Sequence, residues 1–75
     1  MIYNEIKVSF KDAGIKNHML TKNFKETAKN LGFTILNDGI IGPYDSYDAI
    51  EKSTYNPFLV ELKRAYDLGN YSQMN

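Results

Sequence analysis

The chain has 75 residues, of which 43% are hydrophobic and 24% charged, and its nine Lys and Arg balance nine Asp and Glu. These values predict a single small globular domain of residues 1–75 rather than two domains or a disordered chain. With no Cys and one His, the chain excludes disulfides, a cysteine nucleophile and a multi-histidine zinc site, and zero net charge argues against a dedicated polyanion binder.

No stretch of the sequence is apolar over the length that a bilayer requires. The N-terminal residues also lack the basic segment followed by an apolar one that marks a signal peptide. We therefore expect a cytoplasmic protein that makes no contact with a membrane.

The first predicted element is a strand over residues 5–10. Ile6, Val8 and Phe10 alternate with polar residues, and this period of two is typical of a half-buried strand. A helical period follows, with apolar residues four, four and three positions apart, which predicts a helix at about 18–31 with Asn17 or Thr21 as its N-cap. Gly32 stands where a left-handed residue often ends a helix.

A β-hairpin is predicted next. Residues 33–36 form its first arm, Asp38-Gly39 lies between two apolar segments, and Ile40-Ile41 begins the second arm. Gly42-Pro43 ends that arm, because Pro cannot donate a hydrogen bond to a sheet ladder.

Two helices are predicted after the hairpin, at residues 44–52 and 57–68. The second has an N-cap at Asn56, Pro57 in its first turn and Gly69 just after its end. Its apolar face consists of Phe58, Leu59, Leu62, Ala65 and Tyr66. We expect residues 70–75 to be a frayed tail.

The predicted order is therefore β-α-β-β-α-α, which indicates an α+β fold. Because a hairpin cannot hide both of its faces, we expect a two-layer sandwich in which the helices pack on one face of a three-stranded sheet. The first two strands are joined by a helix, so they are parallel if they are neighbours.

Enzymatic and metal-binding patterns are weak. His18 is the only histidine, and no nucleophile elbow or phosphate-binding glycine motif occurs. Asp45, Asp48 and Glu51 are spaced three apart, but the alternating oxygen ligands of a calcium loop are absent. We predict no enzyme activity, no cofactor and no metal site.

Tyrosines and carboxylates are interleaved around the predicted helix at 44–52. Tyrosine is enriched in protein interfaces, and carboxylates steer a basic partner. We predict that this region binds a protein with a basic surface through Tyr44, Asp45, Tyr47, Asp48, Glu51 and Tyr55. The alternative interpretation is that one or two of the rings cap the edge of the core.

Basic residues gather in the N-terminal half. Residues 1–32 hold six lysines against three carboxylates, and residues 33–75 hold three basic residues against six carboxylates. Lys22, Lys25 and Lys29 lie opposite the apolar face of the first predicted helix, so they are candidates for phosphate contacts. The stripe has no Arg to pair with bases, and the alternative is an ordinary solvated helix face.

The segment Ile40-Ile41-Gly42-Pro43-Tyr44-Asp45-Ser46, followed by a helix, resembles the strand–Gly-Pro–aromatic–helix step of SPOR-type peptidoglycan-binding modules. The resemblance covers about a dozen residues and implies a last strand built from the tail at Tyr71-Ser72. SPOR modules work outside the cytoplasm and usually follow a membrane anchor, which this sequence does not show. No functional residue is transferred from that family.

The sequence thus favours a non-enzymatic protein-binding module. Its size class suggests an inhibitor encoded by a phage or mobile element, such as an anti-CRISPR-like anti-defence protein. The alternative is a weak nucleic-acid-binding protein that uses the lysine stripe of the first helix.

Overall fold

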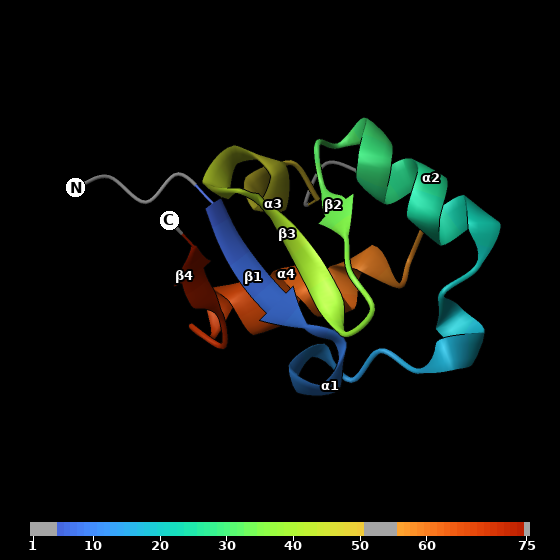
Figure 1. Ribbon diagram of the computed structural model, residues 1–75, viewed down its shortest axis with the longest axis horizontal. Coiled ribbons are helices and arrows are strands. Elements are labelled where there is room, and N and C mark those ends of the chain that lie inside the picture. The colour runs from blue at the N-terminus through green and yellow to red at the C-terminus, as the bar shows by residue number, and fades with distance from the viewer. Residues whose placement is uncertain (1–4, 51–55, 75) are drawn as a thin grey trace.

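This computed structural model describes residues 5–50 and 56–74, which form an α+β fold (Figure 1). A short 3-10 helix at Asn17–Met19 lies between the first two α-helices. In chain order the other elements are β1 (Glu5–Ser9), α1 (Phe10–Ala13), α2 (Lys22–Asn30), β2 (Thr34–Ile35), β3 (Gly39–Pro43), α3 (Tyr44–Ile50), α4 (Leu59–Asp67) and β4 (Ser72–Met74).

The four strands form one antiparallel sheet in the order β2-β3-β1-β4. Figure 1 shows β1 and β3 in front of α4, with β4 and β2 at opposite edges. Two β-α-β units are interleaved, because β3 lies between β1 and β2, and β1 lies between β3 and β4. This is the split β-α-β topology, also called ferredoxin-like.

The α+β class is confirmed, but the predicted three-stranded sheet and the order β-α-β-β-α-α are wrong. The tail that we expected to fray supplies β4, which pairs with β1 from Glu5↔Met74 to Lys7↔Ser72. Its residues have weak strand preference, but β1 offers backbone donors and acceptors that need partners. The strands joined by the first helices, β1 and β2, are not neighbours.

Local signals placed some element ends correctly and others not. The predicted N-cap at Asn56 is wrong, because α4 begins at Leu59 after Phe58, and the Asn56 side-chain oxygen instead accepts from the Phe58 amide at 2.9 Å. Phe10 begins α1 rather than ending β1, and residues 17–19 form the 3-10 helix ahead of α2.

Thr21 caps α2 by accepting a hydrogen bond from the Phe24 amide at 3.2 Å. Gly69 ends α4 with a positive φ of 80°, and the Asn70 amide donates to the Ala65 carbonyl at 2.9 Å. The sequence did not reveal α1, a single turn that Ser9 caps by accepting from the Asp12 amide.

The predicted hairpin is confirmed as β2 and β3, with a different role for its glycines. The turn lies at Asn37-Asp38, and the Leu36 amide donates to the Gly39 carbonyl at 2.8 Å. A Cβ on Gly39 would lie 2.6 Å from the Val8 carbonyl oxygen, and one on Gly42 would lie 2.4 Å from the Phe33 ring. Close packing therefore requires both glycines.

One face of the sheet carries the core. Ile6, Val8 and Ile40 have no exposed surface and pack against the helices, among which Leu59 and Leu62 of α4 are also fully buried. The opposite face carries the alternate side chains of the strands. These are Glu5, Lys7, Ser9, Thr34, Ile41, Pro43, Ser72 and Met74, and none of them is aromatic.

Candidate functional site

Tyr47, which we predicted as a partner contact, is a core residue. Its side chain has no exposed surface, and its hydroxyl donates to the Ile6 and Ile40 carbonyl oxygens, each at 3.2 Å. Tyr47 lies on the side of α3 that packs on the sheet, where these carbonyls satisfy the phenol. The expectation that its ring lies at the surface is therefore wrong.

The Tyr47 ring joins two other rings inside the molecule. Phe33 meets it edge-on with centroids 4.7 Å apart, and Tyr66 of α4 stacks on it at 5.1 Å. Burial raises the pKa of the Tyr47 hydroxyl well above its ordinary value. The ring thus ties α3, α4 and the sheet together.

A second group of rings lies at the surface beside this core. Tyr44, Tyr66 and Tyr71 are half-buried, and we call these three the tyrosine cluster. Tyr66 and Tyr71 are stacked at 5.6 Å, and Tyr44 meets them edge-on at 6.3 and 6.4 Å. The Gln73 side-chain amide of β4 donates to the Tyr44 hydroxyl at 3.2 Å, so three elements meet here.

Exposed carboxylates accompany the tyrosine cluster. Asp45 and Asp48 are exposed on α3, and Asp48 lies one helical turn after Tyr44. The Tyr66 hydroxyl lies close to the Asp48 carboxylate. Burial, and then the nearby Asp48 charge, raises the pKa of Tyr66.

The cation beside the tyrosine cluster, Lys63, already interacts with a carboxylate and a ring. The Lys63 ammonium lies 2.6 Å from an Asp67 carboxylate oxygen and 5.5 Å from the centre of the Tyr66 ring. Asp45 and Glu5, by contrast, make no ion pair or side-chain hydrogen bond with any described residue. The tyrosine cluster together with Asp45 and Asp48 forms what we call the tyrosine–carboxylate surface.

This surface overlaps only partly with the predicted one. Tyr44, Asp45 and Asp48 belong to both, whereas Glu51 and Tyr55 lie outside the described residues. The sequence analysis missed Tyr71, because the tail showed no strand pattern. It assigned Tyr66 only to the apolar face of the last helix. The one signal for a surface role was the polar hydroxyl of Tyr66 at the C-terminal end of that face.

The lysine stripe lies on α2, away from β4 (Figure 1). Lys22, Lys25 and Lys29 are all exposed, and the Lys22 ammonium is 3.9 Å from a Glu26 carboxylate oxygen. Both partners of this pair are largely solvated, so it contributes little to stability. The geometry is that of an accessible basic helix face.

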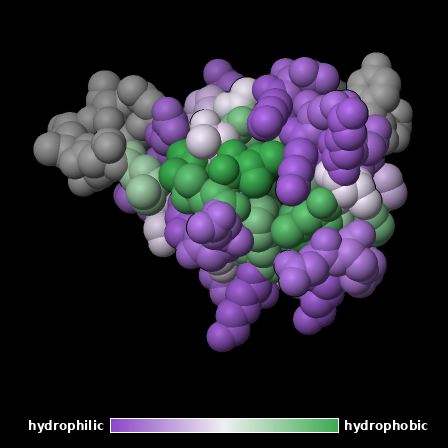
Figure 2. Space-filling view, turned by 45° about the vertical axis from the view of Figure 1, so that its right-hand side comes forward, coloured by the Kyte–Doolittle hydropathy of each residue, from purple (hydrophilic) through white to green (hydrophobic). Residues whose placement is uncertain are grey.

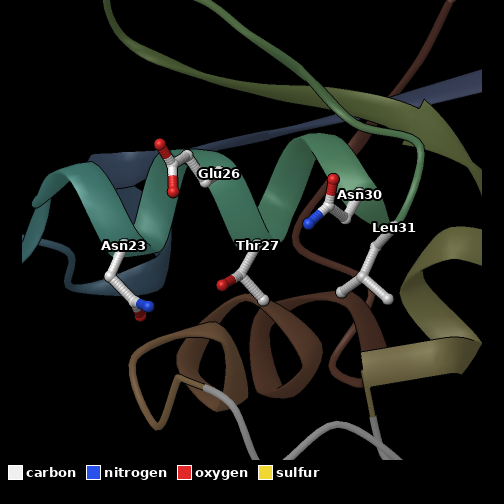
Figure 3. Close-up of a pocket in the computed structure, with 5 residues that line it drawn as sticks. All are labelled: Asn23, Glu26, Thr27, Asn30 and Leu31. Atoms are coloured by element: carbon white, nitrogen blue, oxygen red, sulfur yellow. The ribbon is translucent and has the colours of Figure 1, made fainter.

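A pocket of about 300 Å³ borders the same helix. Figure 3 shows Asn23, Thr27 and Leu31 on the side of α2 that faces α4. At its edge the Asn56 side-chain amide donates to the Asn23 side-chain oxygen at 2.8 Å. Glu26 is the only titratable residue among the described lining, so the pocket lacks a paired acid and base.

The rest of the described surface shows no further cluster of side chains suited to catalysis or metal binding. Figure 2 shows hydrophobic patches framed by hydrophilic side chains on the face turned to the viewer. His18 is exposed on the 3-10 helix. Residues 5–50 and 56–74 contain no group of three side chains that could hold a metal ion, and none of their helices is long and apolar enough to cross a bilayer.

Comparison with known proteins identifies no relative. No family model matches the sequence, and neither a curated protein nor a solved structure is significantly similar to the chain. Any functional conclusion therefore depends on the described side chains and their geometry.

Proposed function

We propose that this protein is a non-enzymatic binding module that contacts a basic protein through the tyrosine–carboxylate surface. One observation carries the proposal: Tyr44, Tyr66 and Tyr71 form a half-buried aromatic cluster with the exposed Asp48 close to Tyr66, and the exposed Asp45, which has no described partner, follows Tyr44 in α3. Rings that pack on one another are held in place before binding, so contact with a partner costs little side-chain entropy.

The charge of this surface favours a basic partner. Asp45 and Asp48 are both exposed, and a basic partner would neutralise them and associate faster because of their field. A domain of this size that covers a basic groove would also block it. An inhibitor, such as an anti-defence protein of a phage or mobile element, is the specific form of the proposal.

Nucleic-acid binding through α2 is the second candidate, favoured by the exposure of Lys22, Lys25 and Lys29 along one helix face. Sheets that bind single strands stack bases on aromatic rings, and the outward face of the described strands has none. Three phosphate contacts predict a log–log salt slope of about −2.7 on duplex DNA.

Affinity capture separates the two candidates. The tagged chain would be offered to an extract of the cells that make it, alongside Asp45→Lys and a Lys25→Ala/Lys29→Ala variant, with circular dichroism as the folding control. We expect a protein that is retained by the parent chain and by the lysine variant but is lost with Asp45→Lys. Retained material that disappears with nuclease treatment and with the lysine variant would overturn the proposal.

A further inference from the structure

The last strand leaves one edge of the sheet open. All three residues of β4 are exposed, and among the described strands only β1 pairs with it. Natural edge strands are usually protected by short length, charged side chains, proline or bulges. Residues 68–74 contain no charged residue and no proline, so the short length of β4, three residues, is the only one of these protections that its sequence shows.

The other edge is a poorer template for pairing. There β2 is only two residues long, and α2 packs beside it. Pairing with an added strand requires free backbone groups, and β2 has one residue fewer than β4 and is also flanked by α2. The open edge of β4 is therefore the one suited to accept another strand.

The tyrosine–carboxylate surface lies next to this edge. Gln73 of β4 bonds to Tyr44, and Tyr71, which stacks on Tyr66, directly precedes β4. In an added strand, successive side chains would point to opposite faces of the sheet. Every second side chain would then lie on the helical side, beside the tyrosine cluster.

Carboxylates predominate at this end of the sheet, because the nearby Lys63 ammonium is paired with Asp67. Glu5 opposes Met74 in the β1–β4 ladder and also opposes Pro43, two residues before Asp45. Glu5 and Asp45 have no described partners, and Asp48 is exposed next to Tyr66. A strand added here would meet carboxylates, so basic side chains fit it and acidic ones do not.

We propose that β4 binds an extended, basic segment of the partner as a fifth strand of the sheet. The inference rests on the proposed function and adds the mode of recognition: backbone hydrogen bonds to β4, with Lys or Arg side chains on the helical side of the sheet toward Asp45 and Asp48, and a side chain on the opposite side toward Glu5. This is β-strand addition, in which the backbone supplies affinity and alternate side chains supply specificity.

A second copy of this chain is a less suitable occupant. Pairing of β4 with β4 around a two-fold axis would bring the same surface of both copies together. The carboxylates of one copy would then face those of the other, and like charges at an interface oppose association. Sedimentation of the free protein would reveal such pairing, and a dimer that Ser72→Lys dissolves would overturn the proposal.

Short synthetic peptides test the mode of binding directly. The probe is a fluorescent alternating Lys-Thr peptide, compared with the same peptide N-methylated at every second amide along one edge. N-methylation removes backbone donors without changing the side chains. We expect the methylated peptide to bind at least about tenfold more weakly, because strand addition needs those donors. The protein amides at 72–74 should become slower to exchange with solvent only in the presence of the unmodified peptide.

Charge variants give the matched control. Asp45→Lys should weaken binding of the Lys-Thr peptide by about fivefold or more, whereas Glu26→Lys on α2, with the same charge change, should alter it less than about twofold. Equal binding of the two peptides, with the Asp45 effect retained, would overturn strand addition and leave the proposed surface intact. If Asp45→Lys and Glu26→Lys act alike, the proposed surface itself is wrong.

Discussion

At the scale of single residues, Tyr47 links more parts of the core than its sequence pattern predicts. A phenol that is buried against a sheet needs an acceptor, and two backbone carbonyl oxygens share its proton. Its ring also connects Phe33 to Tyr66. A residue type that is common at interfaces therefore serves here as an internal link.

Tyr47→Phe tests the role of that hydroxyl. The change removes the donor but keeps the ring, and we expect it to lower the free energy of unfolding by about 1–2 kcal/mol, since buried carbonyls lose a partner. Urea denaturation would measure it. Tyr71→Phe is the control, because no described residue bonds to that hydroxyl, and it should change stability by less than about 0.5 kcal/mol. A Tyr47→Phe protein as stable as the parent would contradict this role.

The raised pKa of Tyr47 predicts how stability depends on pH. Below the ordinary tyrosine pKa of 10.0, both folded and unfolded chains hold the proton, so the group adds no pH dependence. Above it the unfolded chain loses the proton first, and stability should fall by about 1.4 kcal/mol per pH unit. Thermal unfolding between about pH 10 and 12 should therefore show a shallower decline in Tyr47→Phe than in the parent. Parallel declines would indicate that Tyr47 ionises freely in the folded protein.

At the scale of elements, α4 is the support of the helical layer. Its buried residues Leu59, Leu62 and Ala65 face the sheet, and α1 and α3 pack on either side of it. The helix is short, and its stability comes from this burial rather than from helix propensity. Its C-terminal turn also carries Tyr66, so α4 positions the candidate surface as well as the core.

Leu62→Ala should therefore be costly. Leu62 has no exposed surface, and its loss should lower the free energy of unfolding by about 2–5 kcal/mol, most of the stability expected for so small a core. Val60→Ala on the same helix is the matched control, because Val60 is 45% exposed and should cost less than about 1 kcal/mol. Chemical denaturation of both variants would measure these changes. Equal losses of unfolding free energy would show that the helix does not pack on the core through Leu62.

At the scale of the whole molecule, the segment after α4 completes both the sheet and the candidate surface. It pairs with β1, the N-terminal strand, so the two ends of the described chain meet at one edge. This pairing places Tyr71 on Tyr66 and Gln73 on Tyr44. A surface that joins such distant positions exists only once the whole sheet has formed.

Removal of residues 71–75 tests this dependence. The shortened chain keeps the Asn70 amide that ends α4 but loses β4 and the Tyr71 ring, and we expect a loss of about 1–3 kcal/mol. Thermal or urea unfolding would measure it, and full-length Tyr71→Ser separates the contribution of the ring from that of the strand. An unchanged unfolding midpoint would mean that this segment frays after all.

The sequence by itself determined several of the local elements of this protein, though not α1 or β4. Period-two alternation marked β1, helical spacing and caps marked α2 and α4, and the Asn-Asp-Gly segment marked the hairpin, because each signal acts between residues close in the chain. Only the tertiary structure decided that residues 72–74 form a strand, that Tyr47 is core and that Tyr66 and Tyr71 are surface neighbours of Tyr44. These outcomes depend on which edge of β1 lacked a partner and which side of α3 met the sheet, and neither is encoded in local spacing.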